Sequence, residues 1–379
     1  MLERPSKLTS YRFDQLADQI NQRVMPAEAD VERYVGLEHL DPDSLRIRRW
    51  GDPSEVESTK LRFEPGDIIF GKRRVYQRKV AVADTDGICS AHAMVLRAKP
   101  DTVLPEFLPF FMQSDLFMER ALSISVGSLS PTINWKALAK EEFLLPPIQE
   151  QARLVEALSA ARDVVESLKN LHYASNKSHV ALCRQLFRIS NNGKPPATAD
   201  MPGGWQLVSL ADVVDFQNGK RVPLKSSDRA QRQGQYPYYG ASGIIDHINA
   251  YIFEEDLVLL SEDGANLIDR STPIAFIAIG KYWVNNHAHV LRPIPPYSNE
   301  LIVEYLDNLS LAPFITGSAQ PKLNKAAAEK IPIPMLDETS ALFFKEGLGK
   351  SRQVIADVKR RLEMAQTIQK RLLLETVAK

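Results

Sequence analysis

The sequence predicts an α+β protein in which two mixed α/β domains form a tandem repeat and alternate with two long helices that pair with each other. Three observations support this prediction. The second half of the chain matches the first at a shift of roughly 190 to 195 residues. A long segment without proline closes each half, from Gln149 to about Phe187 and from Glu338 to about Val377. Ahead of each of these segments, short strand-like runs alternate with short helical patterns.

Four landmarks keep the same order in the two halves. They are an aromatic opening segment, a strand-like run that contains a histidine, a Gly-Ser turn followed by Pro and Asn at identical spacing, and a short apolar strand that ends at Pro. The matched pairs are Tyr11–Asp18 with Trp205–Asp212, Ser90–Arg97 with Asn285–Arg292, Gly127, Ser128, Pro131 and Asn134 with Gly317, Ser318, Pro321 and Asn324, and Phe143–Ile148 with Ile331–Leu336. We interpret the histidine-containing runs as core strands.

The two proline-free segments have the length and spacing of paired helices. Each would span roughly 60 Å at 1.5 Å per residue. Apolar residues recur at spacings of three and four, as in the seam of a coiled coil; they are Leu154, Leu158, Ala161, Val165 and Leu168, and Ile355, Val358, Leu362 and Ala365. The alternative is that each helix packs only on its own domain. Their length and lack of caps favour pairing with each other.

These features divide the chain into five parts. Turn residues at Asn191–Pro196 place the boundary between the halves after the first helix. We expect a first domain at 1–148, a helix at 149–190, a linker at 191–204, a second domain at 205–337 and a second helix at 338–379.

Each domain is expected to be mixed α and β. Apolar runs predict strands, and aromatic and aliphatic residues at helical spacing predict two helices, whose aromatic side chains we place in the core. The strands are expected at Asp67–Phe70, Lys79–Val82, Ala93–Arg97, Asp256–Leu260 and Ile274–Ile279, and the helices at Glu106–Leu122 and Glu300–Leu311.

Composition narrows the class of protein. The 379 residues are 44% apolar and carry 47 basic and 47 acidic side chains, which excludes wholesale disorder. No run of 18 apolar residues occurs, and Met1–Ser10 lacks the apolar core of a signal peptide. Cys89 and Cys183 are far apart, so neither a disulfide framework nor a zinc knuckle is expected. We therefore expect a soluble, cytoplasmic protein without a membrane partner. A net charge of zero does not exclude a local basic surface that binds nucleic acid.

One basic segment in the first domain is suited to DNA. Five of the eight residues from 72 to 79 are cationic, and an aromatic and an amide side chain lie among them. Such a segment can contact phosphates and base edges. The alternative is a solvated surface loop. The candidate DNA-binding residues are Lys72, Arg73, Arg74, Tyr76, Arg78 and Lys79.

The second domain has its basic residues in a different place. Cations are interleaved there with Gln and Asn, and Arg and Gln are side chains that read guanine and adenine through paired hydrogen bonds. The candidates are Lys220, Arg221, Lys225, Arg229 and Arg232. Because the two basic segments differ while the helices share a plan, we expect the domains to have different targets.

Two further segments of the second domain carry polar or aromatic candidates. Tyr236–Gly243 combines tyrosines with two glycines, so Tyr239 and Ser242 would contact bases, although a packed turn is the alternative favoured slightly. Ser261–Asn266 follows a predicted buried strand. Its carboxylates would accept from a cytosine amino group or simply order the loop, and Asn266 is the candidate reader.

Catalytic motifs are not found. Gly347–Ser351 resembles part of a phosphate-binding loop, but Phe344 stands where the first Gly is required. Ile294–Tyr297 resembles an amino-methyltransferase signature whose first residue must be Asn, Asp or Ser. His287 and His289 are two apart on a predicted strand and so face opposite sides, and His179 and Cys183 share a helix face without further ligands. We expect a non-catalytic chain with no metal and no cofactor of its own.

Taken together, the repeat, the long helices and Leu145–Gln151 at the start of the first helix resemble the specificity subunit of type I restriction-modification enzymes over nearly the whole chain. Further fragments that carry the resemblance are Tyr34–Leu40, Gly66–Lys72, Tyr238–Gly243 and Glu262–Asn266. Ile333–Thr339, at the start of the second helix, departs from the pattern because it lacks the second Pro and the final Gln.

The resemblance implies an architecture and a set of partners. Two target-recognition domains would read the two halves of a split double-stranded DNA sequence, and the helices would form an antiparallel coiled coil that sets the half-site spacing. Two methyltransferase subunits would bind along this frame and use S-adenosylmethionine. Restriction subunits would add ATP- and Mg-dependent translocation and cleavage. Two alternatives remain open, namely a free-standing sequence-specific DNA-binding protein and an enzyme with fused methyltransferase or nuclease parts; the missing catalytic signature argues against the second.

Overall fold

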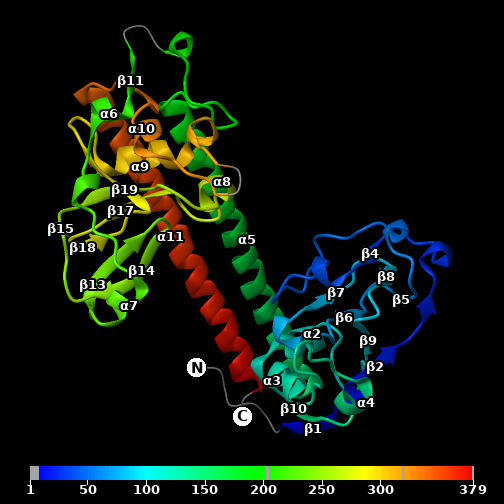
Figure 1. The fold of residues 1–379 in the computed structure, drawn as a ribbon. Coiled ribbons are helices and arrows are strands. Elements are labelled where there is room, and N and C mark those ends of the chain that lie inside the picture. The colour runs from blue at the N-terminus through cyan, green and yellow to red at the C-terminus, as the bar shows by residue number, and fades with distance from the viewer. Residues whose placement is uncertain (1–7, 202–204, 318–319, 378–379) are drawn as a thin grey trace. The chain divides into compact units, whose positions relative to one another are not determined.

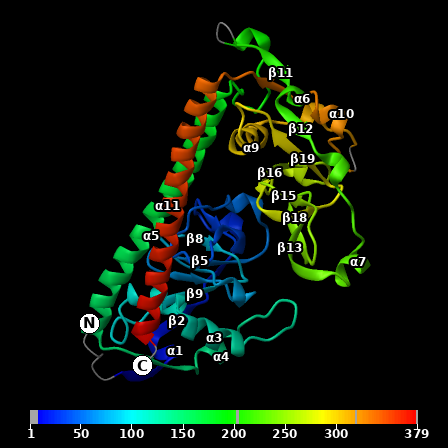
Figure 2. The ribbon, with the colours of Figure 1, turned by 90° about the vertical axis from the view of Figure 1, so that its left-hand side faces the viewer.

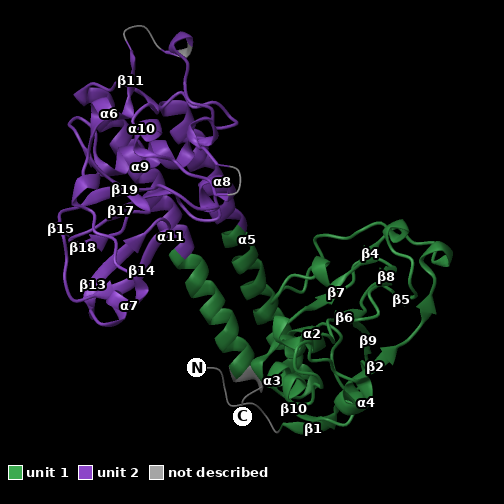
Figure 3. Cartoon of the chain, in the orientation of Figure 1, with its two compact units in different colours: residues 1–169, 360–379 green, residues 170–359 purple. Residues whose placement is uncertain are grey.

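The computed structural model describes residues 8–201, 205–317 and 320–377. Residues 1–7 of the expected first domain, 202–204 of the expected linker, Ser318 of the matched Gly-Ser turn and 378–379 of the expected second helix lie outside the described residues. The chain forms two compact units (Figure 3). Unit 1 comprises Met1–Lys169 and Arg360–Lys379, and unit 2 comprises Asn170–Lys359. Each unit therefore contains one α/β domain together with a segment of both long helices.

Unit 1 contains a two-stranded ladder and two four-stranded sheets (Figure 1). The ladder pairs β1 (Thr9–Arg12) with β10 (Glu142–Leu145). The first sheet has the order β2 (Ala17–Ile20), β9 (Met94–Ala98), β6 (Ile68–Phe70), β7 (Val80–Val82), and the second β3 (Arg23–Val24), β5 (Lys60–Phe63), β8 (Gly87–Cys89), β4 (Tyr34–Val35). Its helices are α1 (Phe13–Leu16), α2 (Phe107–Gln113), α3 (Asp115–Ser123) and α4 (Trp135–Leu138), with 3₁₀ turns η1 (Pro26–Glu28), η2 (Leu37–His39), η3 (Pro53–Glu55) and η4 (Val75–Gln77).

Unit 2 repeats this plan. Its ladder pairs β11 (Leu207–Ser209) with β20 (Pro332–Pro334). One sheet has the order β12 (Val214–Phe216), β19 (Ala288–Pro293), β16 (Leu257–Ser261), β17 (Ala275–Ala278), and the other β14 (Gly243–Ile248), β13 (Gln233–Gly240), β18 (Lys281–Val284), β15 (Phe253–Glu254). The helices are α6 (Leu210–Val213), α7 (Ser226–Ala230), α8 (Asn266–Asp269), α9 (Asn299–Asn308) and α10 (Lys325–Ala328), with 3₁₀ turns η5 (Thr198–Asp200), η6 (Asn218–Lys220) and η7 (Ala312–Phe314). Helix α9 lies against the sheet that contains β16 (Figure 2).

The sheets confirm the internal repeat. In each unit one sheet is antiparallel throughout, and the other contains one parallel pair, β4 with β8 in unit 1 and β13 with β18 in unit 2. The hydrophobic cores of the two units are also formed by equivalent elements. Alternating strand residues and the helix that follows β9 or β19 fill them, and α2 contributes Phe107, Phe110 and Phe111, which are at most 2% exposed. The fold is thus α+β with two mixed domains in tandem.

The long helices α5 (Ile148–Leu186) and α11 (Glu338–Val377) run antiparallel within each unit. In unit 1, Leu154 and Val155 of α5 join the same apolar cluster as Leu372 and Leu373 of α11. In unit 2, Phe187 of α5 packs edge-on against Phe344 of α11, with ring centroids 5.2 Å apart. All nine residues of the predicted seam are buried or half-buried. They form the expected antiparallel coiled coil.

Two expectations about local structure were wrong. The predicted helix Glu106–Leu122 is broken at Ser114, whose backbone is extended and whose Oγ accepts from the N–H of Phe117, so that α3 begins with its own cap. The runs Ser90–Arg97 and Asn285–Arg292 are strands only from Met94 and Ala288 onward. The residues before them, His92 and His287, lie in turns and are exposed.

Candidate nucleic-acid interface

The loop that follows β6 in unit 1 has a structural counterpart after β16 in unit 2. The ladders end just before these loops, where the N–H of Arg73 donates to the carbonyl of His92 at 3.3 Å and that of Glu262 donates to the carbonyl of His287 at 2.9 Å. The carbonyl of Lys72 accepts from the N–H of Ile133 at 2.9 Å, and that of Glu262 accepts from Leu323 at 2.8 Å. One residue later, Arg73 forms an isolated antiparallel β-bridge with Thr132, and Asp263 forms one with Lys322. Two loops distant in sequence therefore have the same backbone anchoring.

The side chains on these two equivalent loops have opposite charge. Unit 1 presents Lys72-Arg73-Arg74, whereas unit 2 presents Glu262-Asp263-Gly264. The last residue of each triplet donates its N–H to the carbonyl of the matched proline, Pro131 or Pro321. A common backbone thus carries two different chemistries.

Histidines accompany both triplets. In unit 1 the guanidinium Nη1 of Arg73 lies 3.3 Å from Nε2 of His92. In unit 2 Nδ1 of His287 lies 2.7 Å from Oδ2 of Asp263. The two histidines occupy matched positions in the repeat. Because both runs were predicted to be core strands, neither histidine was among the candidate site residues, although the matched positions were a signal for them.

The candidates at the start of the basic segment in unit 1 are accessible. Lys72 is half-buried, and desolvation, followed by the nearby charge of Arg23, lowers the pKa of its ammonium. Arg74 is exposed, with its Nε 3.5 Å from Oγ of Ser130. The ring of Tyr76 is also exposed. These side chains and Arg73 can approach a ligand.

The last two candidates of this segment have internal partners. Arg78 pairs with Asp43 at 2.7 Å and with Asp115 at 2.9 Å, and its Nη2 donates to the carbonyl of Gln113 at the end of α2. Lys79 donates to the carbonyl of Leu37.

Arg78 has a counterpart in unit 2 that sequence analysis did not identify. Arg270 also has a left-handed backbone, with φ of 51° against 54° at Arg78. It donates to the carbonyls of Asp307 and Leu309, where α9 ends. The repeat of this contact points to a structural role for both arginines.

The cations predicted in unit 2 also divide into residues with internal partners and residues nearer to solvent. Arg221 donates to Glu262 at 2.8 Å and to the carbonyl of Ala288 at 2.7 Å, and only 13% of its side chain is exposed. Arg229 pairs with Asp246 at 2.9 Å. The remaining candidates lie nearer solvent: Lys220 and Lys225 are exposed, and the half-buried Arg232 lies over the ring of Trp283.

The other three candidates of unit 2 lie on turns or against the core. Tyr239 packs on Phe276 and Tyr282, and burial raises the pKa of its hydroxyl, so its ring forms part of a packed turn. Ser242 is exposed in the turn between β13 and β14. Asn266 uses its amide to hold its own loop: Nδ2 donates to the carbonyl of Thr272, and Oδ1 accepts from the N–H of the same residue.

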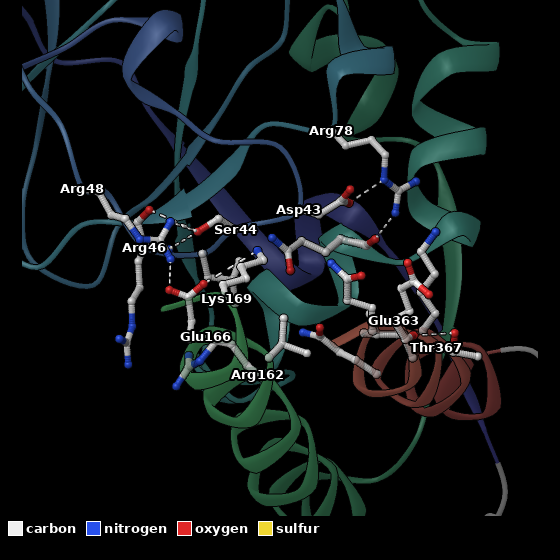
Figure 4. A pocket seen from close by; sticks show the side chains of 17 residues that line it. Asp43, Ser44, Arg46, Arg48, Arg78, Arg162, Glu166, Lys169, Glu363 and Thr367 are labelled. Carbon is white, nitrogen blue, oxygen red and sulfur yellow. Dashed lines mark hydrogen bonds and ion pairs between the residues drawn. The ribbon is translucent and has the colours of Figure 1, made fainter. Parts of the chain in front are cut away.

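A cavity of about 430 Å³ lies in unit 1 between the loop that contains Asp43–Arg48 and segments of α5 and α11 (Figure 4). Its charged groups largely satisfy one another. Arg48 donates to Glu166 of α5, Arg46 pairs with Asp163 of α5, and Asp43 accepts from Arg78. These ion pairs attach the first domain to its helix.

The corresponding attachment in unit 2 is a buried polar cluster. Glu304 of α9 is 2% exposed and accepts from Arg352 of α11 and from Nε2 of His179, 3.0 Å away on α5. Among the described residues no group of His, Cys, Asp and Glu side chains is arranged to hold a metal ion. The described helices include none that is both long enough and apolar enough to cross a membrane.

Comparisons with a family model and with individual relatives indicate the same protein family. A model of the type I restriction modification DNA specificity domain matches residues 53–172 and 202–358. A putative type I restriction enzyme specificity subunit, S.HindORF215P of Haemophilus influenzae, is 39% identical over 126 residues, which is 33% of this chain and 32% of that protein. The EcoDI specificity subunit of Escherichia coli is 32% identical over 178 residues, 44% of this chain and 38% of that protein. These matches span about a third of the length of each relative.

Solved structures show the same fold over the whole chain. A chain from a type I R-M system aligns with a TM-score of 0.62 at 19% identity and covers 100% of both chains. The S subunit of a type I restriction-modification system from M. genitalium aligns with a TM-score of 0.62 at 16% identity and covers 100% of this chain and 98% of that one.

Proposed function

The chain belongs to the type I restriction modification DNA specificity domain family, and we propose on this basis that it is the DNA-recognition subunit of a type I restriction-modification complex. Each unit reads one half of a split double-stranded target. Lysine and arginine contacts to phosphates position the unit, and side chains on the neighbouring loops read base edges. The chain itself carries no catalytic step.

One observation carries the proposal. The loops after β6 and β16 share their backbone anchoring but differ in charge, from Lys72-Arg73-Arg74 to Glu262-Asp263-Gly264. A scaffold that is repeated while its exposed loop side chains change is what the recognition of two different half-sites requires.

The long helices supply the frame for partners. With 39 and 40 residues, α5 and α11 are each about 60 Å long. In the proposal they set the spacing of the half-sites and dock two methyltransferase subunits. Leu342 and Phe343 of α11, adjacent residues that are 60% and 66% exposed, offer an apolar surface for such docking. S-adenosylmethionine binds to the methyltransferase subunits, and ATP and Mg to restriction subunits that join the same complex.

Co-purification and methylation mapping test this function. The chain is purified from its own cells, and adenine methylation of the genome is mapped with and without its gene. We expect a methyltransferase subunit to co-purify, and deletion to abolish methylation at one split motif. If the chain purifies alone and the methylation pattern is unchanged, the restriction-modification role is wrong and a free-standing DNA-binding protein is the better description.

A charge-reversal pair tests the interface. We expect Arg73→Glu with Arg74→Glu to abolish binding of the split target while co-purification persists, because two cations at the proposed DNA surface become anions. The matched control reverses two exposed lysines near α4 in the same unit, Lys136→Glu with Lys140→Glu, and should bind DNA within a few fold of wild type. Equal binding by both variants at physiological salt would show that the basic segment is only a solvated surface.

A further inference from the structure

We propose that the loop position after β6 in unit 1 and after β16 in unit 2 determines specificity. Arg73 with His92 reads a base whose major-groove edge offers hydrogen-bond acceptors, and Asp263 with His287 reads a base whose major-groove edge carries an amino group. The inference rests on the proposed function. It goes further by assigning opposite base chemistry to the two units. Arg73 recognises guanine, whereas Asp263 recognises cytosine or adenine.

In unit 1 the backbone holds Arg73 so that its guanidinium can face outward. The N–H of Arg73 donates to the carbonyl of His92 at 3.3 Å, and its backbone bridges Thr132. Among the described residues the guanidinium makes one hydrogen bond, from Nη1 to His92, so its remaining N–H groups are available for the O6 and N7 acceptors of guanine.

His92 is suited to orient that guanidinium. Desolvation lowers the pKa of His92, as do the charges of Arg73, Lys72 and Lys60. The ring is therefore neutral at pH 7, and its Nε2 can accept from Arg73 rather than repel it. A guanidinium held by one hydrogen bond loses less freedom when it binds a base, which sharpens discrimination.

In unit 2 the exposed carboxylate is Asp263, not Glu262. Glu262 is 13% exposed and is already paired with Arg221 at 2.8 Å and with Lys322 at 3.7 Å. The side chain of Asp263 is 32% exposed, and that of its partner His287 is 50% exposed. Oδ2 is bonded to His287, and among the described residues Oδ1 has no hydrogen-bond partner, so Oδ1 is the acceptor available to a base.

A carboxylate at a DNA surface selects strongly. Phosphates repel it, and a base edge that offers only acceptors leaves it unpaired and desolvated. An amino group of cytosine or adenine removes that penalty, because it donates directly to the carboxylate. Asp263 therefore favours one class of base mainly by rejecting the other.

Competition binding by the purified complex tests the assignment. The wild-type chain, with the subunits that co-purify with it, is titrated against its split target and against duplexes in which each base pair of both half-sites is changed in turn. For wild type we expect at least a tenfold loss of affinity at one guanine in one half-site and at one amino-bearing base in the other. Arg73→Ala should remove the first discrimination only. Asp263→Asn should weaken the second only, because an amide donates as well as accepts and so no longer rejects a base edge that offers only acceptors. Asn retains the shape of Asp, so a folding defect is not expected from it.

The control and the contrary outcomes separate this inference from the function on which it depends. Lys140→Glu should keep both discriminations. If wild type discriminates at both half-sites and each variant does so to the same degree, the reading residues lie elsewhere and the inference is overturned while the proposed function stands. The inference is likewise overturned if Asp263→Asn changes preference in the same half-site as Arg73→Ala. If wild type shows no sequence preference and forms no complex, both fail.

Discussion

Arg74 and Gly264 occupy the same place in the two units. Both have a left-handed backbone, with φ of 58° and 108°, and each donates its N–H to the carbonyl of the matched proline, Pro131 at 2.7 Å and Pro321 at 3.1 Å. Glycine adopts this conformation without strain, whereas arginine does not. Unit 1 thus has an arginine at a position where its counterpart has the residue that this conformation favours.

Replacing this arginine should separate stability from binding. We expect Arg74→Gly to leave the free energy of unfolding unchanged or to raise it by up to about 1 kcal/mol, because backbone strain is relieved. DNA affinity should fall, and the slope of log affinity against log salt should become shallower by about 0.9 if one phosphate contact is lost. Urea unfolding and salt-dependent binding measure the two effects. A destabilised variant with normal DNA binding would contradict the assignment.

The two arginines that cap helix ends should behave as structural residues. Arg78→Met and Arg270→Met each leave helix-terminal carbonyls without their donor. We expect each change to lower the free energy of unfolding by about 1–3 kcal/mol and to leave the preferred bases unchanged. Arg74→Met, which removes an exposed side chain, is the control for the loss of positive charge. Should Arg78→Met unfold like wild type but lose DNA binding, Arg78 would be a DNA contact after all.

The buried cluster of unit 2 should make stability depend on pH. Burial by itself would raise the pKa of Glu304, but hydrogen bonds from His179 and Arg352 outweigh burial, and the pKa is lowered below its usual 4.5. A carboxyl group with a lowered pKa contributes stability above its unfolded pKa, and that contribution is lost as the pH falls through its folded pKa. Glu304→Gln should therefore lower stability by about 1.5–3 kcal/mol at pH 7 and by less in acid. Unfolding of wild type and variant is measured at several pH values from 3.5 to 7. A difference in stability between the two proteins that does not change with pH would contradict the prediction.

One glycine of β13 lies so close to the backbone of a neighbouring strand that a larger residue should destabilise the protein. A Cβ on Gly234 would overlap the backbone of Asn249, beside the irregular pairing of β13 with β14. We expect Gly234→Ala to cost about 1–3 kcal/mol because the strands must separate locally. Gly219→Ala is the matched control, since a Cβ there meets nothing within 4 Å. Comparable midpoints of thermal unfolding for the two variants would count against the predicted overlap.

The fold was largely predictable because its signals are periodic. The shift between the halves, the seam from Leu154 to Leu168 and the strand that ends at Pro146 are each readable from local spacing. The break at Ser114 was not. The aromatic spacing of Phe107–Phe117 continues through it, whereas the hydroxyl of Ser114 donates to the carbonyl of Phe111 and accepts from the N–H of Phe117, and these bonds replace the regular helical pattern.

The candidate site was less predictable, because charge alone does not tell which cations are already paired. Lys72 to Lys79 is one basic run in the sequence, yet Arg74 is exposed and Arg73 is half-buried beside His92, while Arg78 is held by Asp43 and Asp115, 35 and 37 residues away along the chain. The same holds for Arg221, whose partner Glu262 lies 41 residues further on.

By itself the sequence determined that the chain is a tandem α+β repeat with two paired helices, because the repeat and the hydrophobic periods can be read along the chain. Only the tertiary structure decided which side chains on the repeated loops are available. Hydrogen bonds between distant segments bury Arg221 and Glu262 against each other and leave Arg73 and Asp263 half-buried at equivalent positions, each bonded to one histidine. That distinction depends on which groups meet across the fold, and no local pattern records it.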